Sequence, residues 1–297
     1  MYIEEAGVNP VASKGAKIPR ERSLNGIEGL FKLYDLDFDE QSVMVGDKLT
    51  NAELLDSLDQ PTTNLLKSSD PVVLSHWGPE FDPDYYALGP YIGQRFGLDS
   101  TIFDVIDRGS LSPLVALHVL HRVMEGDKLT AEGSFRSALF AFQQNTVPLP
   151  KNSKAMVPET SGLGYLFLTQ EKTGNLRIVD IQEFDAGLLA QNPASLYEEI
   201  QTIIREIREN STHPIRIFSR RSSHINKLLR HQKTTDSWFD GRGVSLCDWS
   251  SEVSSLALFS FLSHLNASFE PGQILYIEED FETMAFGVLV LEVSQNG

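Results

Sequence analysis

The sequence predicts an α/β protein made of two similar halves. Apolar segments of strand length alternate with segments of helical periodicity, and this alternation occurs twice along the chain. Such a pattern favours helices packed on sheets in layers. We place the boundary near Thr173 to Asn175, which divides the chain into an N-terminal half, residues 1–174, and a C-terminal half, residues 175–297.

The first half opens with a predicted strand. Its strands are predicted at Met1–Val8, Pro71–Trp77, Ile102–Ile106, Ser137–Phe142 and Gly164–Thr169. Its helices are predicted at Asp47–Lys67, at Ala87–Phe96 and in a long apolar stretch that begins at Leu111. Thr50 is the candidate N-cap of the first helix, and Pro61 should end or kink that helix because proline has no amide hydrogen. Pro10–Pro19 is expected to be a loop.

The second half repeats this order, with a polar turn between its last two strands. Its strands are predicted at Leu176–Phe184, Ile215–Phe218, Ile274–Ile277 and Phe286–Val293, and its helices at Pro193–Asn210 and Val253–Leu265. Both halves therefore contain the strands and helices that a layered α/β fold requires.

Composition indicates a globular protein. The chain has 297 residues, of which 41% are apolar, which is enough for one large core or two smaller ones. A single cysteine excludes an internal disulfide and fits a reducing compartment. Neither a signal peptide nor a run of about 18 apolar residues occurs, so we expect a cytoplasmic protein without a membrane span.

The net charge of −16 limits the expected partners. Nucleic acids and anionic membranes both require a basic face, so neither is expected to bind. Acidic proteins, including acyl carrier proteins, are disfavoured unless a local basic patch outweighs the total charge. One dense basic stretch lies close to His224 and His231, and it consists of Arg216, Arg220, Arg221, Lys227, Arg230 and Lys233. We interpret it as the solvated face of a helix.

The most informative segment is Thr101–Glu125, in which Ile102–Ile106, a strand that we expect to be buried, passes through a short corner into the long apolar helix. Corners of this kind hold a reactive side chain at a helix N-terminus, where free amide groups and the helix dipole stabilise a thiolate or an oxyanion. Here residues 107–110 read DRGS, and the only cysteine, Cys247, is distant in the sequence. The corner therefore has no cysteine nucleophile.

Several motifs, taken in order, resemble one known family. Phe103–Val105, followed by the corner and the apolar helix, is similar to the active-site segment of the ketoacyl synthase III-like branch of the thiolase superfamily. Ser137–Thr146 resembles the family's next strand, and Thr160–Gly164 resembles its glycine-rich turn. Val253–Leu265 and Phe269–Gln273 resemble its closing helix and turn. The resemblance implies a thiolase-like fold with α/β/α/β/α layers.

The chain departs from the family pattern at the catalytic positions. The family's condensing cysteine aligns with Gly109 or Ser110, its catalytic histidine falls near Ser219, and its catalytic asparagine falls near Ser250. Condensation needs a thiolate that takes the acyl group and two polar donors that hold the developing oxyanion, so these degenerate positions indicate a silent site. The tryptophan-bearing early loop with which relatives bind coenzyme A is also missing. The chain is most similar to cysteine-less, non-catalytic subunits of heterodimeric synthases such as alkylquinolone signal synthase.

The resemblance implies three hypotheses about function. The first is an inert subunit that pairs with an active ketoacyl synthase III-like homologue in the biosynthesis of a fatty-acyl-derived secondary metabolite or signal. In that complex an acyl thioester would bind through the partner, and we expect no cofactor and no metal in this chain. The second is a cysteine-independent acyltransferase that acts on an acyl thioester. The third is a homodimeric pseudoenzyme that binds a lipid-like ligand.

The resemblance also implies an interface. In that family the strand after the nucleophile helix pairs across the dimer axis, which would place Ser137–Thr146 there. Both faces of this strand are mostly apolar, as in a strand that is central in a sheet extending through both subunits. The predicted interface residues are Ala138, Leu139, Phe140, Ala141, Phe142 and Gln143.

Several small or reactive residues have a structural interpretation beside a functional one. As a nucleophile, Ser110 would need a base nearby, and we interpret it instead as the cap of the long helix, with Pro113 in the first turn. Gly162 and Gly164 lack the third glycine and the helix of a dinucleotide-binding motif, so we expect them to relieve crowding at a turn. Cys247 is interpreted as a small buried residue.

The histidines have similar alternatives. His118, His121 and Glu125 share one helix face, where we favour an ion pair over a metal site. His224 and Asn226 have the wrong spacing for the family's catalytic pattern, so we do not assign them a catalytic role.

Overall fold

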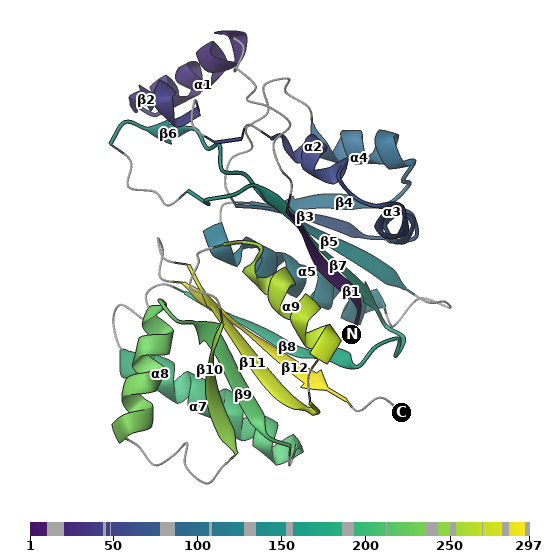
Figure 1. Cartoon of the computed structure of the whole chain (residues 1–297), viewed down its shortest axis with the longest axis vertical. Coiled ribbons are helices and arrows are strands. Elements are labelled where there is room, and N and C mark those ends of the chain that lie inside the picture. The colour runs from purple at the N-terminus through teal and green to yellow at the C-terminus, as the bar shows by residue number, and fades with distance from the viewer. Residues whose placement is uncertain are drawn as a thin grey trace.

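Figure 1 shows the computed structural model of the chain. It describes residues 1–10, 21–43, 46–47, 49–77, 87–106, 109–127, 135–152, 157–185, 193–211, 213–235, 243–249, 254–268, 270–280 and 285–294. Most of the predicted loop at residues 10–19, the corner residues 107–108 and Ser250 lie outside these ranges. Among the described residues, no helix combines the length and the apolar character needed to cross a membrane.

The strands of the N-terminal half are hydrogen-bonded in the order β4-β3-β5-β7-β1. They are β1 (Tyr2–Pro10), β3 (Val72–His76), β4 (Ile102–Val105), β5 (Arg136–Gln143) and β7 (Gly162–Thr169). β3 is parallel to β4 and β5, whereas β7 is antiparallel to β5 and β1. All five strands coincide with segments predicted from apolar runs.

The strands of the C-terminal half follow in the order β8-β12-β11-β9-β10. They are β8 (Leu176–Phe184), β9 (Ile215–Arg220), β10 (Val244–Trp249), β11 (Gly272–Glu279) and β12 (Phe286–Val293). β9 is parallel to β10 and β11, and β12 is antiparallel to β11 and β8. One residue pair, Tyr2 with Arg177, joins β1 to β8 and links the two sets of strands.

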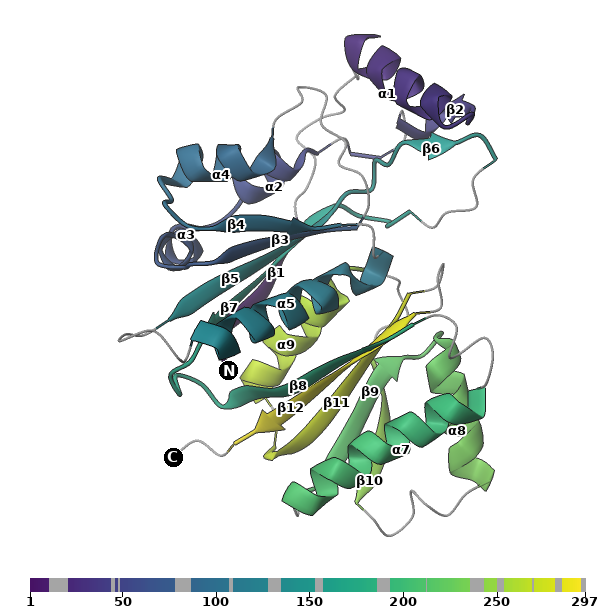
Figure 2. The ribbon, with the colours of Figure 1, turned by 180° about the vertical axis from the view of Figure 1, so that it is seen from behind.

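Two helices lie between the two sets of strands (Figures 1 and 2). They are α5 (Ser112–Asp127) and α9 (Ala257–Ser268), whose apolar side chains share one core with the inner faces of both sheets. The outer face of the N-terminal sheet is covered by α2 (Asn51–Leu55), α3 (Gln60–Lys67) and α4 (Leu88–Phe96). The outer face of the C-terminal sheet is covered by α7 (Pro193–Asn210) and α8 (His224–Thr235). The predicted α/β/α/β/α layering is confirmed.

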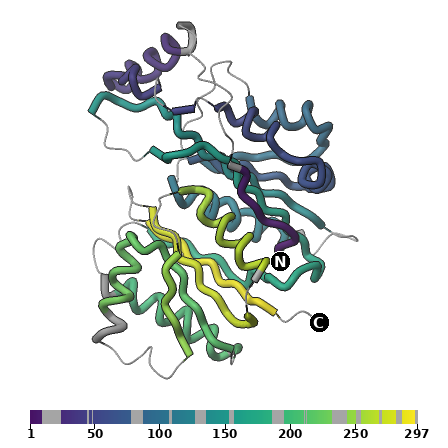
Figure 3. Tube along the Cα trace, in the orientation of Figure 1, coloured from purple at the N-terminus to yellow at the C-terminus, as the bar shows by residue number. Residues whose placement is uncertain are grey.

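A small unit projects from the N-terminal half (Figure 3). It contains α1 (Glu21–Leu33), β2 (Phe38–Asp39) and the 3-10 turn η1 (Glu40–Val43). β2 pairs with β6 (Leu149–Pro150) in a separate two-stranded sheet. The sequence analysis did not predict this unit. Its strands have only two residues, too few to show a periodicity, and the 13-residue helix α1 was missed.

The segment Asp47–Lys67 contains two helices where one was predicted. Thr50 caps α2 as predicted, and it forms a reciprocal capping box with Glu53. Pro61, in contrast, lies in the first turn of α3 and so begins a helix. The prediction that proline ends the helix was wrong because the first turn does not use the missing amide hydrogen.

Two strand predictions also need correction. Ile102–Ile106 was expected to be buried, but β4 lies at the edge of the sheet and Ile106 is 54% exposed. β10 was not predicted, because Ser245 and Asp248 interrupt its apolar run. A strand at the edge of a sheet keeps part of its surface in solvent, so its sequence is less apolar than that of a central strand.

The predicted interface strand is internal to this chain. β5 is hydrogen-bonded along both edges, to β3 and to β7. The side chains from Ala138 to Phe142 are at most 1% exposed, and Gln143 is 4% exposed. The prediction that Ala138–Gln143 forms the dimer interface is therefore wrong. Both faces of the strand are apolar because helices cover both sides of its own sheet.

Candidate functional site

The corner before α5 is a tight turn. β4 ends at Val105, Gly109–Leu111 forms the 3-10 turn η2, and α5 begins at Ser112. Gly109 has a φ of +50°, in the left-handed region that favours glycine. A Cβ at this position would lie 2.4 Å from Oδ1 of Asp280, the residue that follows β11. A side chain at one of the two positions predicted for the condensing cysteine would therefore have to displace Asp280.

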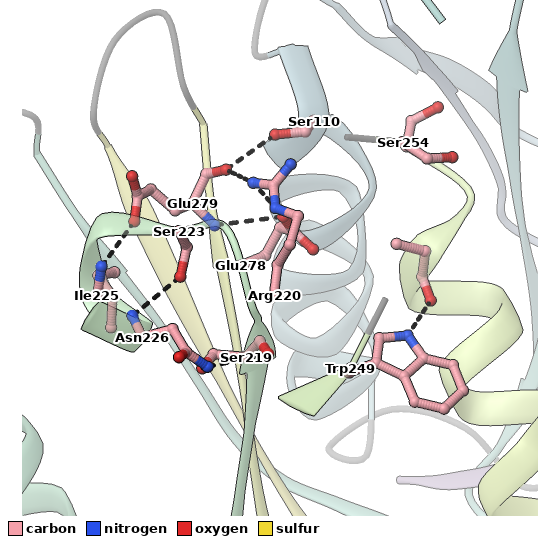
Figure 4. Close-up of polar contacts among 12 residues, drawn as sticks. Ser110, Ser219, Arg220, Ser223, Ile225, Asn226, Trp249, Ser254, Glu278 and Glu279 are labelled. Carbon is pink, nitrogen blue, oxygen red and sulfur yellow. Dashed lines mark hydrogen bonds and ion pairs between the residues drawn. The ribbon is translucent and has the colours of Figure 1, made fainter. Parts of the chain in front are cut away.

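Ser110, the other predicted position, is buried and 3% exposed. Its hydroxyl donates a hydrogen bond of 3.2 Å to the carbonyl oxygen of Glu279 in β11 (Figure 4). Ser110 lies within the 3-10 turn, and α5 begins two residues later, with Pro113 in its first turn as predicted. The predicted capping role of Ser110 is wrong, because its hydroxyl binds the neighbouring strand instead of the helix.

β9 presents an arginine to this corner. Successive side chains of the strand alternate between its two faces. Ser219 faces α8, where its hydroxyl accepts a 2.9 Å hydrogen bond from Nδ2 of Asn226. Arg220 faces the central layer and forms a buried ion pair with Glu278, with 3.0 Å between Nη2 and Oε1. Near the position expected for the family's histidine, the side chain directed towards the corner is therefore Arg220 and not Ser219 (Figure 4).

The ion pair belongs to a buried polar cluster, which consists of Ser110, Arg220, Tyr276, Glu278 and Glu279. Arg220 donates to the same Glu279 carbonyl oxygen that accepts from Ser110. Tyr276 donates its hydroxyl to Oε2 of Glu278 at 2.5 Å. Burial raises the pKa of Glu278 more than the charge of Arg220 lowers it, and burial also raises the pKa of Tyr276.

The side chain of Glu279 points to the opposite face of β11 and binds the start of α8. Its carboxylate lies 2.6 Å from Nδ1 of His224 and accepts a 3.0 Å hydrogen bond from the amide of Ile225. A carboxylate is stabilised at a helix N-terminus by the free amide groups and the dipole. His224 thus binds a structural carboxylate. The side-chain amide of Asn226 also donates a hydrogen bond to the carboxylate of Asp248. These contacts agree with the interpretation that His224 and Asn226 are not a catalytic pair.

The third predicted position, Ser250, lies outside the described residues. Just before it, Trp249 donates its indole N–H to the carbonyl oxygen of Ala257 at 3.4 Å (Figure 4). Gln143 of β5 binds the segment that enters α9. Its Oε1 accepts a 2.7 Å bond from the Ser254 hydroxyl and a 3.0 Å bond from the Ser255 amide. Gln143 therefore joins the two halves of this chain.

The basic stretch predicted as a solvated face is divided among several environments. Arg220 is buried, and Arg216 donates to the carbonyl oxygen of Glu270 at 2.8 Å. Arg230 pairs with Asp248, whose pKa is lowered mainly by that hydrogen bond. Lys227 is exposed, as the prediction requires. The prediction of a helix face was wrong for Arg216 and Arg220, because both lie on the strand β9.

The histidines of α5 lie beside carboxylates. His118 lies 2.6 Å from Glu183, and His121 lies 3.7 Å from Glu125. Burial lowers the pKa of His121. In the described part of the chain, no group of three or more histidine, cysteine, aspartate or glutamate side chains could hold a metal ion.

The two glycines of the predicted turn pack against the central helical layer. A Cβ at Gly162 would lie 2.7 Å from the Leu256 side chain, and one at Gly164 would lie 2.5 Å from the Phe259 ring. Their function is therefore close packing of β7 against the segment that contains α9. Cys247 is half-buried in β10, where it pairs with Phe218 of β9.

The layered architecture defines the class of fold. Two sheets enclose two helices, and a strand-to-helix corner leads into one of them, as in the thiolase-like fold of condensing enzymes. Solved structures of that fold align with the whole chain. No protein-family model matches the sequence, and no curated protein matches it.

Three solved structures illustrate the likeness. The tetronic acid condensing enzyme AbyA1 has a TM-score of 0.61 at 12% identity, over 99% of each chain. The 3-oxoacyl-(acyl carrier protein) synthase III FabH from Pseudomonas aeruginosa PAO1 has a TM-score of 0.56 at 10% identity, over 100% of this chain and 99% of that one. Germicidin synthase from Streptomyces coelicolor, a type III polyketide synthase, has a TM-score of 0.56 at 9% identity, over 99% of each chain. At these identities the likeness shows the fold alone.

Proposed function

We propose that this chain is a catalytically inert subunit of ketoacyl synthase III type. It pairs with an active homologue in a heterodimeric condensing enzyme that makes a fatty-acyl-derived metabolite or signal. The observation that supports this most strongly is the filled corner before α5. Asp280 occupies the space beside Gly109, and Ser110 is buried beside the ion pair of Arg220 and Glu278.

The chemistry of the corner argues against the alternative of a cysteine-independent acyltransferase. A serine nucleophile needs a base within hydrogen-bond reach and an open approach for the thioester. The hydroxyl of Ser110 donates to a backbone carbonyl, and a carbonyl oxygen is too weak a base to activate it. Arg220, whose guanidinium donates to the same oxygen, is a cation and cannot accept a proton.

The free edge of β4 is the surface that we propose for the partner. β4 is the terminal strand of the N-terminal set, and its outer edge has no strand partner in the described part of the chain. Exposed edges of this kind pair readily with another chain. Ile106, directly after β4, adds an exposed apolar side chain to the same edge. Pairing there would extend the N-terminal sheet into the second subunit.

We expect Ile106→Lys to abolish co-purification with the active homologue. A charged side chain beside the edge would have to lose its hydration when a partner strand pairs there. Folding should be unchanged because the side chain is already exposed. Val179→Lys is the matched control, since Val179 is 40% exposed on β8. If the Ile106→Lys and Val179→Lys variants recover equal amounts of the homologue, the partner binds at another surface.

We also expect that the isolated chain forms no covalent acyl intermediate. Intact-mass spectrometry after incubation with acyl-coenzyme A donors measures this directly. An acyl adduct mapped to Ser110 would overturn the inert assignment and support the acyltransferase.

The full test is co-expression with a neighbouring homologue that retains cysteine, histidine and asparagine. The two chains should purify together, and the homologue should lose activity when this chain is omitted, although no catalytic residue is removed. If scattering shows a soluble monomer and the homologue works equally well alone, the heterodimer proposal is refuted.

A further inference from the structure

The C-terminal half contains a cavity that is separate from the corner. Its volume is about 690 Å³, and it lies on the outer face of the C-terminal sheet between α7 and the strands β8, β11 and β12. Small-molecule sites typically have volumes of about 300–1,000 Å³. Because the corner faces the central layer, nothing in the proposed function uses this cavity.

The floor of the cavity is aliphatic. It is formed by Ile203 and Ile207 of α7, Val179 of β8 and Val290 of β12. Ile203 and Val290 belong to the outer core of this half, whereas Val179 is 40% exposed. A ligand body placed here would cover the side chain of Val179, which is now partly in contact with solvent.

One largely buried polar side chain lines this space and has no side-chain partner among the described residues. The outer face carries a row of paired residues on the neighbouring strands β8, β12 and β11, namely Arg177, Glu292 and Gln273. Arg177 binds Glu292 at 3.2 Å. Gln273 is 7% exposed and lines the cavity, but its side-chain amide makes no hydrogen bond to any described residue. Its side-chain oxygen can therefore accept a hydrogen bond from a ligand in the cavity.

The charges around the cavity favour a cation. Four carboxylates line it, those of Asp180, Glu206, Glu209 and Glu292, against the guanidinium groups of Arg177 and Arg208; His213 also lines it. Arg177 is paired with Glu292, and Asp180 accepts a 2.7 Å hydrogen bond from Gln182. Nη2 of Arg208 is buried without a hydrogen-bond partner among the described residues, and it lies 3.2 Å from the position of a Cβ on Gly243 rather than open to the cavity. The carboxylate excess attracts an ammonium group and repels an anion.

We propose that this cavity binds a small primary amine with an apolar body. The body lies on the aliphatic floor, and the ammonium group donates to the side-chain oxygen of Gln273 within the field of the carboxylates. This site is independent of the corner before α5 and of any partner subunit.

Calorimetric titration of the full chain with tryptamine tests the proposal, with indole-3-propionate as the matched acid. We expect tryptamine to bind and the acid not to bind. Gln273→Leu should weaken tryptamine binding at least tenfold. Val179→Trp should abolish it by filling the cavity from an exposed position that does not overpack the core. Gln60→Leu, on the exposed surface of α3, is the control and should bind normally.

Thermal unfolding of each variant separates a loss of binding from a loss of folding. Equal binding of the acid and the amine would refute the proposed ligand class. Binding that persists in a folded Val179→Trp variant, or no binding of tryptamine at millimolar concentration, would refute the site. None of these results depends on whether the chain has a catalytic partner.

Discussion

Replacing Glu278 with leucine is expected to lower the free energy of unfolding by about 3–5 kcal/mol, because it leaves the Arg220 guanidinium buried without its counter-ion. The side chains of Arg220 and Glu278 are 3% and 5% exposed, so water cannot take over the lost interaction. Urea denaturation of the purified variant measures the change. This is the largest single effect that we expect outside the apolar core.

The double variant Arg220→Met with Glu278→Leu should be clearly more stable than Glu278→Leu alone, because it removes both charges. Tyr276→Phe is the control for the hydrogen bond that Glu278 accepts from the Tyr276 hydroxyl. It should lower the free energy of unfolding by about 1 kcal/mol. Asp56→Ala breaks the exposed pair with Arg95 and should change stability little. A double variant no more stable than Glu278→Leu would show that the buried charge is not the cause.

The raised pKa of Glu278 also predicts a dependence on pH. Burial favours the neutral carboxyl in the folded state, so the pKa of Glu278 is above the value of 4.5 that it has when unfolded. The part of its contribution to stability that depends on protonation is therefore full below pH 4.5 and is lost as pH rises through the folded pKa, whereas the ion pair with Arg220 remains. The difference in unfolding free energy between the natural chain and Glu278→Gln should decrease over that range. A difference that stays constant or rises with pH would contradict this sign.

Gly109→Ala is expected to destabilise the chain by about 2–3 kcal/mol. About 1–2 kcal/mol of this comes from the left-handed φ of +50°, and the rest comes from displacement of Asp280 by the new Cβ. Gly97→Ala is the matched control, because Gly97 has a φ of +68° and a Cβ there would have no atom within 4 Å. The difference between the two variants therefore measures the contact with Asp280.

A cysteine at position 109 would also contact the side chain of Asp280. Gly109→Cys should be destabilised at least as much as Gly109→Ala. It should not produce malonyl-dependent chain extension, since our assignment places serine at the other two catalytic positions, Ser219 and Ser250. Adding Asp280→Gly should recover part of the lost stability by making room for the side chain. Chain extension by Gly109→Cys alone would show that the catalytic positions have been misassigned.

The sequence alone predicted the strands that are buried on both faces, such as β5 and β12, because long apolar runs leave few alternatives to a sheet interior. It also predicted the cap at Thr50, where side chain and backbone interact within a few residues. The position of β5 in its sheet could not be predicted from the sequence. A strand that pairs within its own chain and a strand that pairs with a partner chain have the same apolar pattern.

The candidate site was predictable only at its corner. The absence of cysteine from residues 107–110 is visible in the sequence, and so is the run of three acids, Glu278 to Asp280, at the end of an apolar strand. Buried acids in such a place signal a polar cluster, although sequence reasoning missed it. The partner of those acids is 58 residues away from Glu278, in Arg220, and only the pairing of β9 with β11 brings the two together.

The sequence by itself therefore determined the layered α/β class, the order of its elements and the absence of a cysteine from the corner, since each depends on local periodicity or residue identity. The tertiary structure decided which side chains surround the corner. Alternation along β9 directs Ser219 outward and Arg220 inward, and alternation along β11 directs Glu278 inward and Glu279 outward. The filled corner results from these two strands lying side by side, a contact between distant segments that no local pattern encodes.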